Sequence, residues 1–141
     1  MPHKSKMESK KATVMVVEDE HLLLKAIERK LKLNNLNVIA CESGTEALES
    51  FDKIPQLPDA IWLDYYLGDI NGIEFMQKLR KNPKLADIPV LVVSNSANPD
   101  KVSKMMALGA KDYLLKADYR LDRLVLEIQS LIETKKSTNN G

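Results

Sequence analysis

The amino-acid sequence predicts an α/β fold, a doubly wound five-stranded parallel sheet with helices on both faces. Two observations lead to this prediction. Five short apolar segments rich in β-branched residues alternate strictly with five segments of helical periodicity, and no internal repeat or low-complexity linker interrupts the alternation. A chain of 141 residues is long enough to bury one hydrophobic core, which suits a single domain. Crossovers between parallel strands are right-handed, so successive helices can cover both faces of the sheet.

The alternation begins near the N-terminus. Residues 12–17 form a short apolar run that predicts a buried strand. Apolar residues at helical spacing follow over residues 20–33, and residues 36–41 predict the second strand. Ser43 and Glu46 have the spacing of a capping box, so we expect the second helix to begin there.

The middle of the chain continues the pattern after a turn-rich segment. Residues 60–63 predict the third strand, which ends at Asp64. Asn71 is expected to start the third helix, because a small polar side chain there can accept a hydrogen bond from the first helical turn. Residues 89–94 predict the fourth strand and are almost entirely apolar, as expected where both faces of a strand are covered.

The last two helices and the fifth strand have clear boundary signals. Asn98 followed by Pro99 predicts the start of the fourth helix. Gly109 predicts the end of that helix, because glycine readily adopts the left-handed C-terminal conformation. Residues 112–115 predict the fifth strand, and residues 121–132 place their apolar side chains on one stripe, which predicts an amphipathic fifth helix.

Composition excludes several classes of protein. Hydrophobic residues make up 44% and charged residues 29% of the chain, which is typical of a soluble globular protein. No apolar run is long enough to span a bilayer, so we expect no membrane insertion. The N-terminus has no apolar stretch of the secretory type, and the one cysteine, Cys41, cannot form an internal disulfide. We therefore expect a cytoplasmic protein.

Charge is unevenly distributed along the chain. The formal net charge is +1, but lysines are concentrated in residues 1–11 and 134–141 while residues 12–133 are mildly acidic. We expect a folded domain over residues 12–133 between a flexible basic N-terminal tail and a flexible C-terminal tail. A nucleic-acid surface needs basic residues clustered on a structured element, so we expect no direct binding of nucleic acid.

Charged and polar residues follow four of the five predicted strands. Glu18 and Asp19 follow the first strand, Asp64 the third, Ser94 ends the fourth, and Lys116 follows the fifth. The carboxyl ends of parallel strands meet at one edge of the sheet, which is where such folds bind their ligands. If the first and third strands are neighbours, the three carboxylates converge.

This set of side chains suits phosphoryl transfer. Converging carboxylates repel one another unless a cation neutralises them, and Mg²⁺ prefers oxygen ligands of this kind. A carboxylate can attack phosphorus while a metal ion and a lysine neutralise the phosphoryl oxygens. Each residue also has a structural interpretation. The acidic pair Glu18 and Asp19 can cap the next helix, and Asp64 can be a turn residue.

The order and spacing of several segments resemble the receiver domain of two-component response regulators, of the stand-alone single-domain type. The resemblance covers residues 12–133, nearly the whole chain. It rests on the segments VMVVEDE (14–20), SGTEAL (43–48), WLDYYLGDINGIEF (62–75), IPVLVVSNS (88–96) and ALGAKDYLLKAD (107–118).

The resemblance implies a flavodoxin-like (βα)5 fold with strand order 2-1-3-4-5. It also implies that Asp64 is the phosphoacceptor and that Lys116 contacts the phosphoryl group. Mg²⁺ would be bound directly by Asp19, Asp64 and the backbone carbonyl of Tyr66. Glu18 would reach the metal through water.

The resemblance further implies a switch. Ser94 matches the hydroxyl that turns toward the phosphate, and Tyr113 matches the aromatic residue that moves inward with it. Tyr66 and Ser96 match two variable positions that tune dephosphorylation in the family. A bulky tyrosine near the phosphate can hinder an attacking water, so we expect a fairly long-lived phosphoryl group.

The chain departs from the family pattern in two loops. Leu67-Gly68 stands where the family commonly has Met-Pro, and glycine makes a loop costlier to order. Lys116-Ala117 stands where the family has Lys-Pro, usually with a cis bond. A cis bond before alanine costs about 3–4 kcal/mol, so either the bond is trans and the loop differs, or the fold holds a strained peptide.

The function that the resemblance implies is a phosphorylation switch and not an enzyme in the usual sense. The phosphoryl donor would be a histidine kinase or a histidine phosphotransfer protein. The output surface would be the face of the fourth helix, fifth strand and fifth helix, which would bind a downstream protein or a second copy in a homodimer.

Two other classes remain open on the sequence. One is a receiver-like protein-binding module that does not depend on phosphorylation. The other is an enzyme on a similar fold, since fold alone does not determine function. A flavin enzyme would need a phosphate-binding loop after the first strand, where this chain has Glu-Asp-Glu. A haloacid-dehalogenase-type phosphatase would need a second acid at position 66, which is Tyr66 here.

Overall fold

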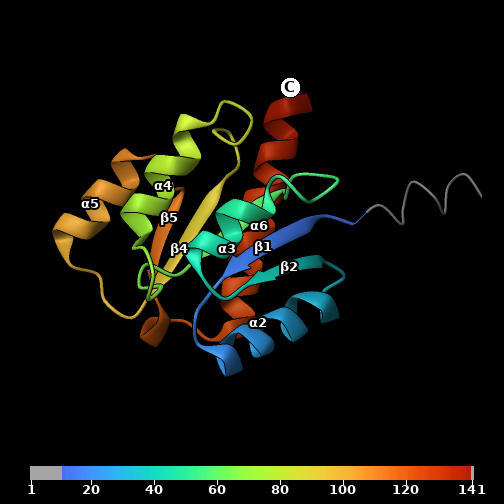
Figure 1. The fold of residues 1–141 in the computed structure, drawn as a ribbon. Coiled ribbons are helices and arrows are strands. Elements are labelled where there is room, and N and C mark those ends of the chain that lie inside the picture. Colours follow the sequence, from blue (N-terminus) through green and yellow to red (C-terminus); the bar gives the residue numbers. More distant parts are fainter. Residues whose placement is uncertain (1–10, 141) are drawn as a thin grey trace, which may run out of the picture.

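The structure is a computed structural model that describes residues 11–140, with side chains as far as Lys136. Of the expected N-terminal tail, residues 1–11, all but Lys11 lie outside the described residues. The strands and helices alternate as the sequence predicts (Figure 1). They are β1 (Thr13–Val17), α2 (His21–Leu33), β2 (Asn37–Cys41), α3 (Gly44–Ser50), β3 (Ala60–Leu63), α4 (Gly72–Lys81), β4 (Val90–Ser94), α5 (Pro99–Ala107), β5 (Asp112–Leu115), the 3-10 helix η1 (Lys116–Asp118) and α6 (Leu121–Asn140).

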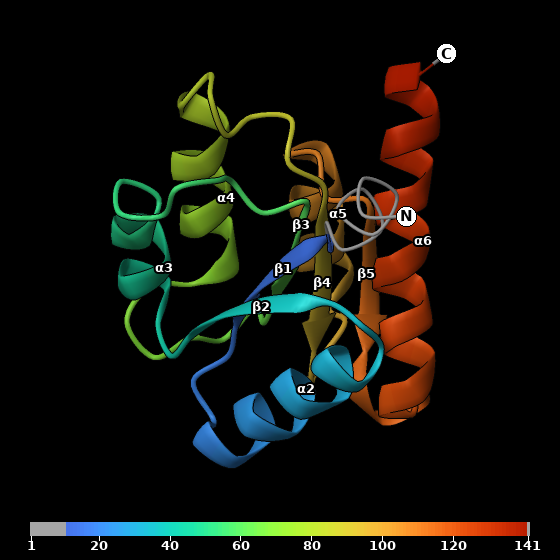
Figure 2. The same ribbon diagram turned by 90° about the vertical axis from the view of Figure 1, so that its right-hand side faces the viewer.

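The five strands form one parallel sheet in the order β2-β1-β3-β4-β5. This is the predicted doubly wound order. Strand residues alternate between two hydrophobic clusters, because successive side chains of a strand point to opposite faces. Met15 and Val17 of β1 pack on the face covered by α3, α4 and α5, whereas Val14 and Val16 pack on the face covered by α2 and α6. Figure 2 shows α3 and α4 on one side of the sheet and α6 on the other.

Helix boundaries follow the predicted capping residues. The Ser43 hydroxyl accepts a hydrogen bond from the Glu46 amide (3.0 Å). The side chains of Asn71 and Asn98 cap α4 and α5 in the same way. Gly109, just beyond α5, has φ +94°, the left-handed conformation that glycine adopts without steric cost.

Two boundaries differ from the sequence prediction. The last helix is expected over residues 121–132, but α6 continues to Asn140 through most of the segment expected to be a flexible tail. No glycine or proline interrupts this segment, and Lys135 donates a hydrogen bond to the Asp87 carbonyl (2.6 Å). The sequence also did not predict η1, the short turn directly after β5.

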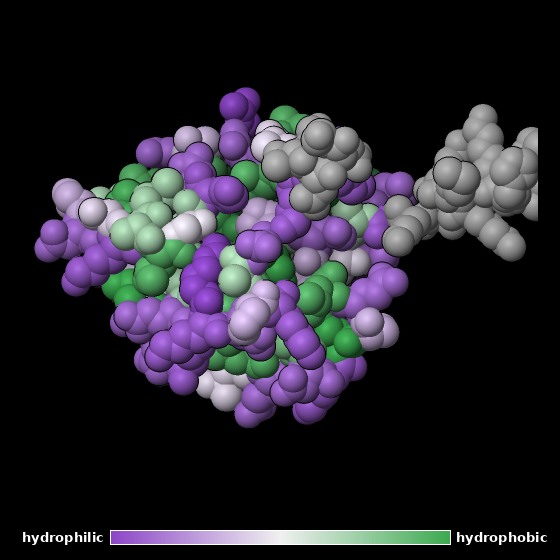
Figure 3. All heavy atoms as spheres, turned by 90° about the horizontal axis from the view of Figure 1, so that it is seen from above, coloured by the Kyte–Doolittle hydropathy of each residue, from purple (hydrophilic) through white to green (hydrophobic). Residues whose placement is uncertain are grey.

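The apolar length of the helices and the mixture of side chains on the surface match what the composition predicts. Among the described residues, no helix is long and apolar enough to cross a membrane. Figure 3 shows hydrophilic and hydrophobic side chains interspersed on the face seen from above.

Candidate functional site

Three carboxylates meet at the carboxyl ends of β1 and β3. Val17 pairs with Leu63 in the sheet, so Glu18 and Asp19 lie beside Asp64. One carboxylate oxygen from each of the three acids lies within 4.8 Å of the others. Glu18 is 1% exposed and Asp64 4% exposed, while Asp19 faces solvent. The predicted convergence of these side chains is confirmed.

Lys116 joins the cluster from the end of β5. Its ammonium donates hydrogen bonds to Glu18 Oε1 (2.9 Å) and to Asp64 Oδ2 (3.1 Å). Burial is the main cause that raises the pKa of Glu18 to about 7. The charge of Asp64 acts in the same direction, and the hydrogen bond from Lys116 opposes the shift. Burial lowers the pKa of Lys116, but the two carboxylates outweigh burial and the pKa lies above its ordinary value. One ammonium therefore balances three carboxylates only in part.

The donor set fits a hard divalent cation. All the converging ligand atoms are carboxylate oxygens, which Mg²⁺ prefers, and the incomplete charge balance favours a further positive charge. The Tyr66 amide donates to Asp64 Oδ1 (3.3 Å), so the backbone that carries the predicted carbonyl ligand lies against the phosphoacceptor candidate.

Ser94 and Tyr113 form a second group beside the carboxylates. Ser94, at the end of β4, is fully buried, and its hydroxyl accepts a hydrogen bond from the Ser96 amide (3.4 Å). The hydroxyl of the half-buried Tyr113 donates to the Ser96 carbonyl (2.7 Å). The two predicted switch residues are thus linked through Ser96.

Comparison with known proteins identifies the family. The family model of the response regulator receiver domain matches residues 14–129. The chain belongs to the response regulator receiver family.

Relatives support this assignment. The chain is 36% identical to the two-component response regulator ORR8 of Oryza sativa subsp. japonica over 103 residues, which are 73% of this chain and 84% of that protein. It is 34% identical to the transcriptional regulatory protein PrrA of Mycobacterium bovis over 125 residues, 89% of this chain and 52% of PrrA. The family consists of signalling domains of two-component systems and not of conventional enzymes.

Solved structures show the same fold. A CheY-like receiver domain protein from Methanospirillum hungatei matches with a TM-score of 0.82 and 17% identity, covering 92% of this chain and 99% of that chain. The receiver domain of the Francisella response regulator 1452 matches with a TM-score of 0.77 and 23% identity, covering 88% and 98%.

The peptide bond between Lys116 and Ala117 differs from the one usual in this family. The described residues contain no cis peptide bond, so Lys116-Ala117 is trans. The chain continues from Lys116 into the turn η1, and the ammonium still reaches both Glu18 and Asp64. The first of the two alternatives for this loop is therefore the observed one.

Tyr66 ties two loops of the receiver domain together. Its hydroxyl lies 3.1 Å from the Ser96 hydroxyl and is also hydrogen-bonded to the Lys101 ammonium of α5. That ammonium lies 4.5 Å from the centre of the Tyr66 ring and 5.2 Å from that of Tyr65, within cation–π range. The pairing of Tyr66 with Ser96 brings together the two positions singled out in the sequence. The contact of Lys101 had no sequence signal, because it comes from a residue 35 positions away.

The loop after β3 is anchored at several points. The Gly72 amide donates to the Tyr65 carbonyl (2.8 Å), and Tyr66 and Asn71 form an isolated antiparallel bridge. Gly68, where the family commonly has proline, has φ +82°, a conformation that other residues rarely adopt. Asp69 reaches across to α3, a contact that the sequence analysis missed.

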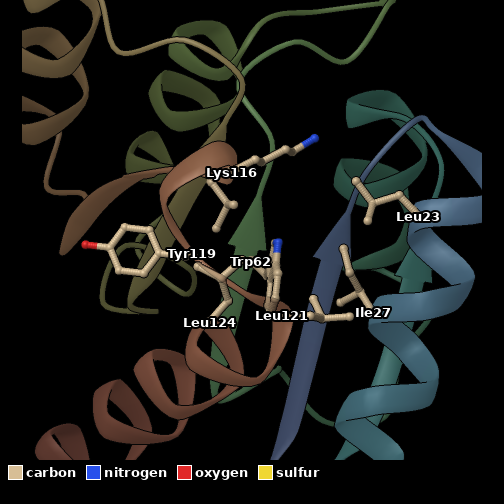
Figure 4. A pocket seen from close by; sticks show the side chains of 8 residues that line it. Leu23, Ile27, Trp62, Lys116, Tyr119, Leu121 and Leu124 are labelled. Carbon is tan, nitrogen blue, oxygen red and sulfur yellow. The ribbon is translucent and has the colours of Figure 1, made fainter.

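An apolar cavity of about 180 Å³ lies between α2 and the segment from η1 to α6, and Lys116 belongs to its lining. Figure 4 shows the side chain of Lys116 at its edge, with the ammonium pointing away from Leu121 and Leu124. The Trp62 indole N–H is buried there without a hydrogen-bond partner among the described residues. The rest of the lining is apolar or aromatic, and it comprises Leu23, Ile27, Val93, Tyr119, Leu121 and Leu124.

Proposed function

We propose that this receiver domain accepts a phosphoryl group on Asp64 in an Mg²⁺-dependent reaction and thereby switches a protein-binding face. The observation that carries the proposal is the convergence of the buried Glu18 and Asp64 with the exposed Asp19. Lys116 bridges the two buried carboxylates and neutralises the cluster only in part. The proposed donor is a histidine kinase or a histidine phosphotransfer protein, as the family membership favours.

The chemistry follows from the positions of the two Asp64 oxygens. One oxygen forms a bond to phosphorus as the bond between phosphorus and the donor's histidine nitrogen breaks. The hydrogen bonds from the Tyr66 amide and the Lys116 ammonium hold the carboxylate in one orientation. We assign Asp19, Asp64 and the Tyr66 carbonyl as direct Mg²⁺ ligands and Glu18 as a ligand through water. Bound Mg²⁺ supplies positive charge that neutralises the phosphoryl oxygens.

Lys116 has two roles in this proposal. Before the reaction it pairs with Glu18 and Asp64 and offsets part of their negative charge. After the reaction the same ammonium can pair with a phosphoryl oxygen in place of Asp64 Oδ2.

The switch would act through Ser94 and Tyr113. Phosphorylation biases an equilibrium between two conformations only if the phosphate binds one of them better. A hydrogen bond from Ser94 to the phosphate would pull the segment at Ser96, and Tyr113 is bonded to the carbonyl of that residue. The response would reach the face of α5, β5 and α6, which we propose as the surface for a downstream protein or a second copy.

Two further assignments complete the proposal. We place the domain at residues 12–133 and its location in the cytoplasm. We propose no direct contact with nucleic acid, because the strongly basic segments lie outside this domain.

The test is the intact mass of the protein after incubation with Mg²⁺ and either acetyl phosphate or phosphoramidate, a donor with a P–N bond. One added phosphoryl group is expected. It should be absent in Asp64→Asn and in excess EDTA, and present in Asp52→Asn, which changes an exposed aspartate in the turn after α3. Retention of the added mass by Asp64→Asn would identify a different acceptor. No addition from either donor would favour the alternative, a protein-binding module independent of phosphorylation.

A further inference from the structure

The loop of residues 65–71 has to hold a backbone carbonyl at the metal site. Tyr66 contributes no side-chain ligand to the proposed Mg²⁺, so its carbonyl depends on the path of the loop. Gly68 gives that loop a conformationally free residue, because glycine adopts many backbone angles in the absence of other contacts. The bridge between Tyr66 and Asn71 restricts part of its path, and contacts with other elements can restrict the rest.

The carboxylate of Asp69 makes such a contact with α3. Asp69 Oδ1 accepts a hydrogen bond from the Gly44 amide (3.1 Å), and Oδ2 accepts one from the Thr45 amide (2.8 Å). Both amides belong to the first turn of α3, whose backbone N–H groups have no partner within the helix. Burial raises the pKa of Asp69, but hydrogen bonds from Thr45, Ile70 and Gly44 outweigh it and hold the pKa well below its ordinary range.

Close packing surrounds this contact. A Cβ atom at Gly44 would lie 2.5 Å from Ile70 Cγ1, so the loop and α3 are in direct van der Waals contact. Leu67 is buried beside them. On its other side the loop borders the metal site, because a Cβ atom at Gly68 would lie 3.4 Å from Asp19 Oδ2. The loop is therefore clamped between α3 and a proposed metal ligand.

We propose that Asp69 is a positioning residue, which sets the affinity of the site for Mg²⁺ by fixing the loop that carries the Tyr66 carbonyl to the first turn of α3. The inference rests on the proposed function and deepens it. Coupling between sites is reciprocal, so Mg²⁺ binding should in turn order the first turn of α3.

The chain contains a matched control for a purely structural role. Ser43 caps the same turn of α3, since its hydroxyl accepts from the Glu46 amide (3.0 Å), but Ser43 does not belong to the loop. Ser43→Ala and Asp69→Ala each remove side-chain acceptors from the start of α3. Only Asp69→Ala also removes the hydrogen bonds between the loop and α3.

The experiment measures Mg²⁺ affinity by calorimetry, without any phosphoryl donor, in the wild type, Asp69→Ala, Asp69→Asn and Ser43→Ala, together with the thermal midpoint of each. Residues that support metal ligands typically change affinity by about 10- to 100-fold, so we expect the Kd of Asp69→Ala to rise by about 10-fold. Asp69→Asn keeps one acceptor oxygen and should lie between Asp69→Ala and the wild type. Ser43→Ala should bind Mg²⁺ as the wild type does, although its thermal midpoint falls.

Amide hydrogen exchange provides a readout that does not depend on phosphorylation. Mg²⁺ should slow exchange at Gly44 and Thr45 in the wild type and in Ser43→Ala, and not in Asp69→Ala. Equal Mg²⁺ affinity in Asp69→Ala and the wild type would overturn the inference. An equal loss of Mg²⁺ affinity in Ser43→Ala would also overturn the inference, because the loss would then be a general effect of destabilising α3. Failure of the wild type itself to bind Mg²⁺ would instead overturn the proposed function.

Discussion

Two charged sites lie at opposite ends of the parallel strands and differ in how their charge is satisfied. At the amino ends of β4 and β5, the Arg80 guanidinium donates to four backbone carbonyls at distances of 2.7–3.2 Å. At the carboxyl ends, Lys116 donates to Glu18 and Asp64 and leaves the three-carboxylate cluster short of positive charge.

The difference distinguishes a charged group that stabilises the fold from a charged cluster that can bind an ion and react. The donors of Arg80 are bonded to the chain before β4 and to the turn before β5, so this cluster is complete within the protein. The carboxylate cluster is incomplete, because buried negative charges repel unless a further cation binds. Changes at Arg80 should therefore affect folding alone, and changes at the carboxylates should affect chemistry and ion binding.

The largest effect is expected for Lys116→Met. Removing a charged donor aimed at a developing anion typically slows catalysis by about 100- to 1,000-fold, and we expect a loss of this size in the rate of phosphorylation by acetyl phosphate. The rate can be followed by intact mass against time. Lys111→Met, which changes an exposed lysine before β5, should react as the wild type does. A Lys116→Met rate close to that of the wild type would remove Lys116 from the proposed mechanism.

Arg80→Ala should be the largest change in stability. It leaves four carbonyls without their donor, and we expect the free energy of unfolding to fall by about 3 kcal/mol. Urea denaturation measures the change, and Arg29→Ala, on the exposed face of α2, is the control. The folded Arg80→Ala protein should keep the Mg²⁺ affinity of the wild type. A loss of Mg²⁺ affinity there would break the distinction between the two clusters.

The pH dependence of stability should come from Glu18. Its pKa is about 7 in the folded protein, against an ordinary value of 4.5 for an exposed glutamate. The folded state therefore keeps a proton that the unfolded state has lost between these values, and stability falls as pH rises through them. From pH 5 to pH 8 the metal-free protein should lose about 2 to 3 kcal/mol of stability.

Urea denaturation in EDTA at each pH tests this prediction. Glu18→Gln cannot ionise, so its stability should change much less over the same range. Mg²⁺ should reduce the loss in the wild type because it binds the ionised form. An unchanged pH profile in Glu18→Gln would show that another group titrates.

The smallest effect is expected at Tyr66, at the edge of the carboxylate cluster. Tyr66→Ala removes both the ring and its bonds to Ser96 and Lys101, and it should open a path for water to the phosphoryl group. We expect hydrolysis to accelerate by about tenfold, equivalent to about 1.4 kcal/mol in the barrier. The rate of hydrolysis is measured as the loss of the added phosphoryl mass over time, after the phosphoryl donor has been removed. Tyr66→Phe keeps the ring but loses its hydroxyl, so it separates the effect of the ring from that of its hydrogen bonds. Equal lifetimes of the phosphoryl group in the wild type, Tyr66→Ala and Tyr66→Phe would exclude any role of Tyr66 in hydrolysis.

The sequence predicted most of the fold and the members of the charged cluster. Hydrophobic periodicity and capping residues are local, so residues 12–17 or the Asn98-Pro99 pair indicate their structure without knowledge of the rest of the chain. The carboxylates could be placed together for a simple geometric reason. Parallel strands bring their carboxyl ends to one edge, so Glu18 and Asp64 meet once β1 and β3 are neighbours.

Tertiary structure alone decided the contacts between loops and the ends of some elements. Asp69 reaches α3, Lys101 reaches Tyr66, and Arg80 joins the two segments before β4 and β5. These pairs depend on the path of each loop, which no periodicity encodes. The trans bond at Lys116-Ala117 and the continuation of α6 to Asn140 were settled in the same way. Local patterns determine which residues form strands and helices, whereas long-range hydrogen bonds and packing determine where a loop or a helix end comes to lie.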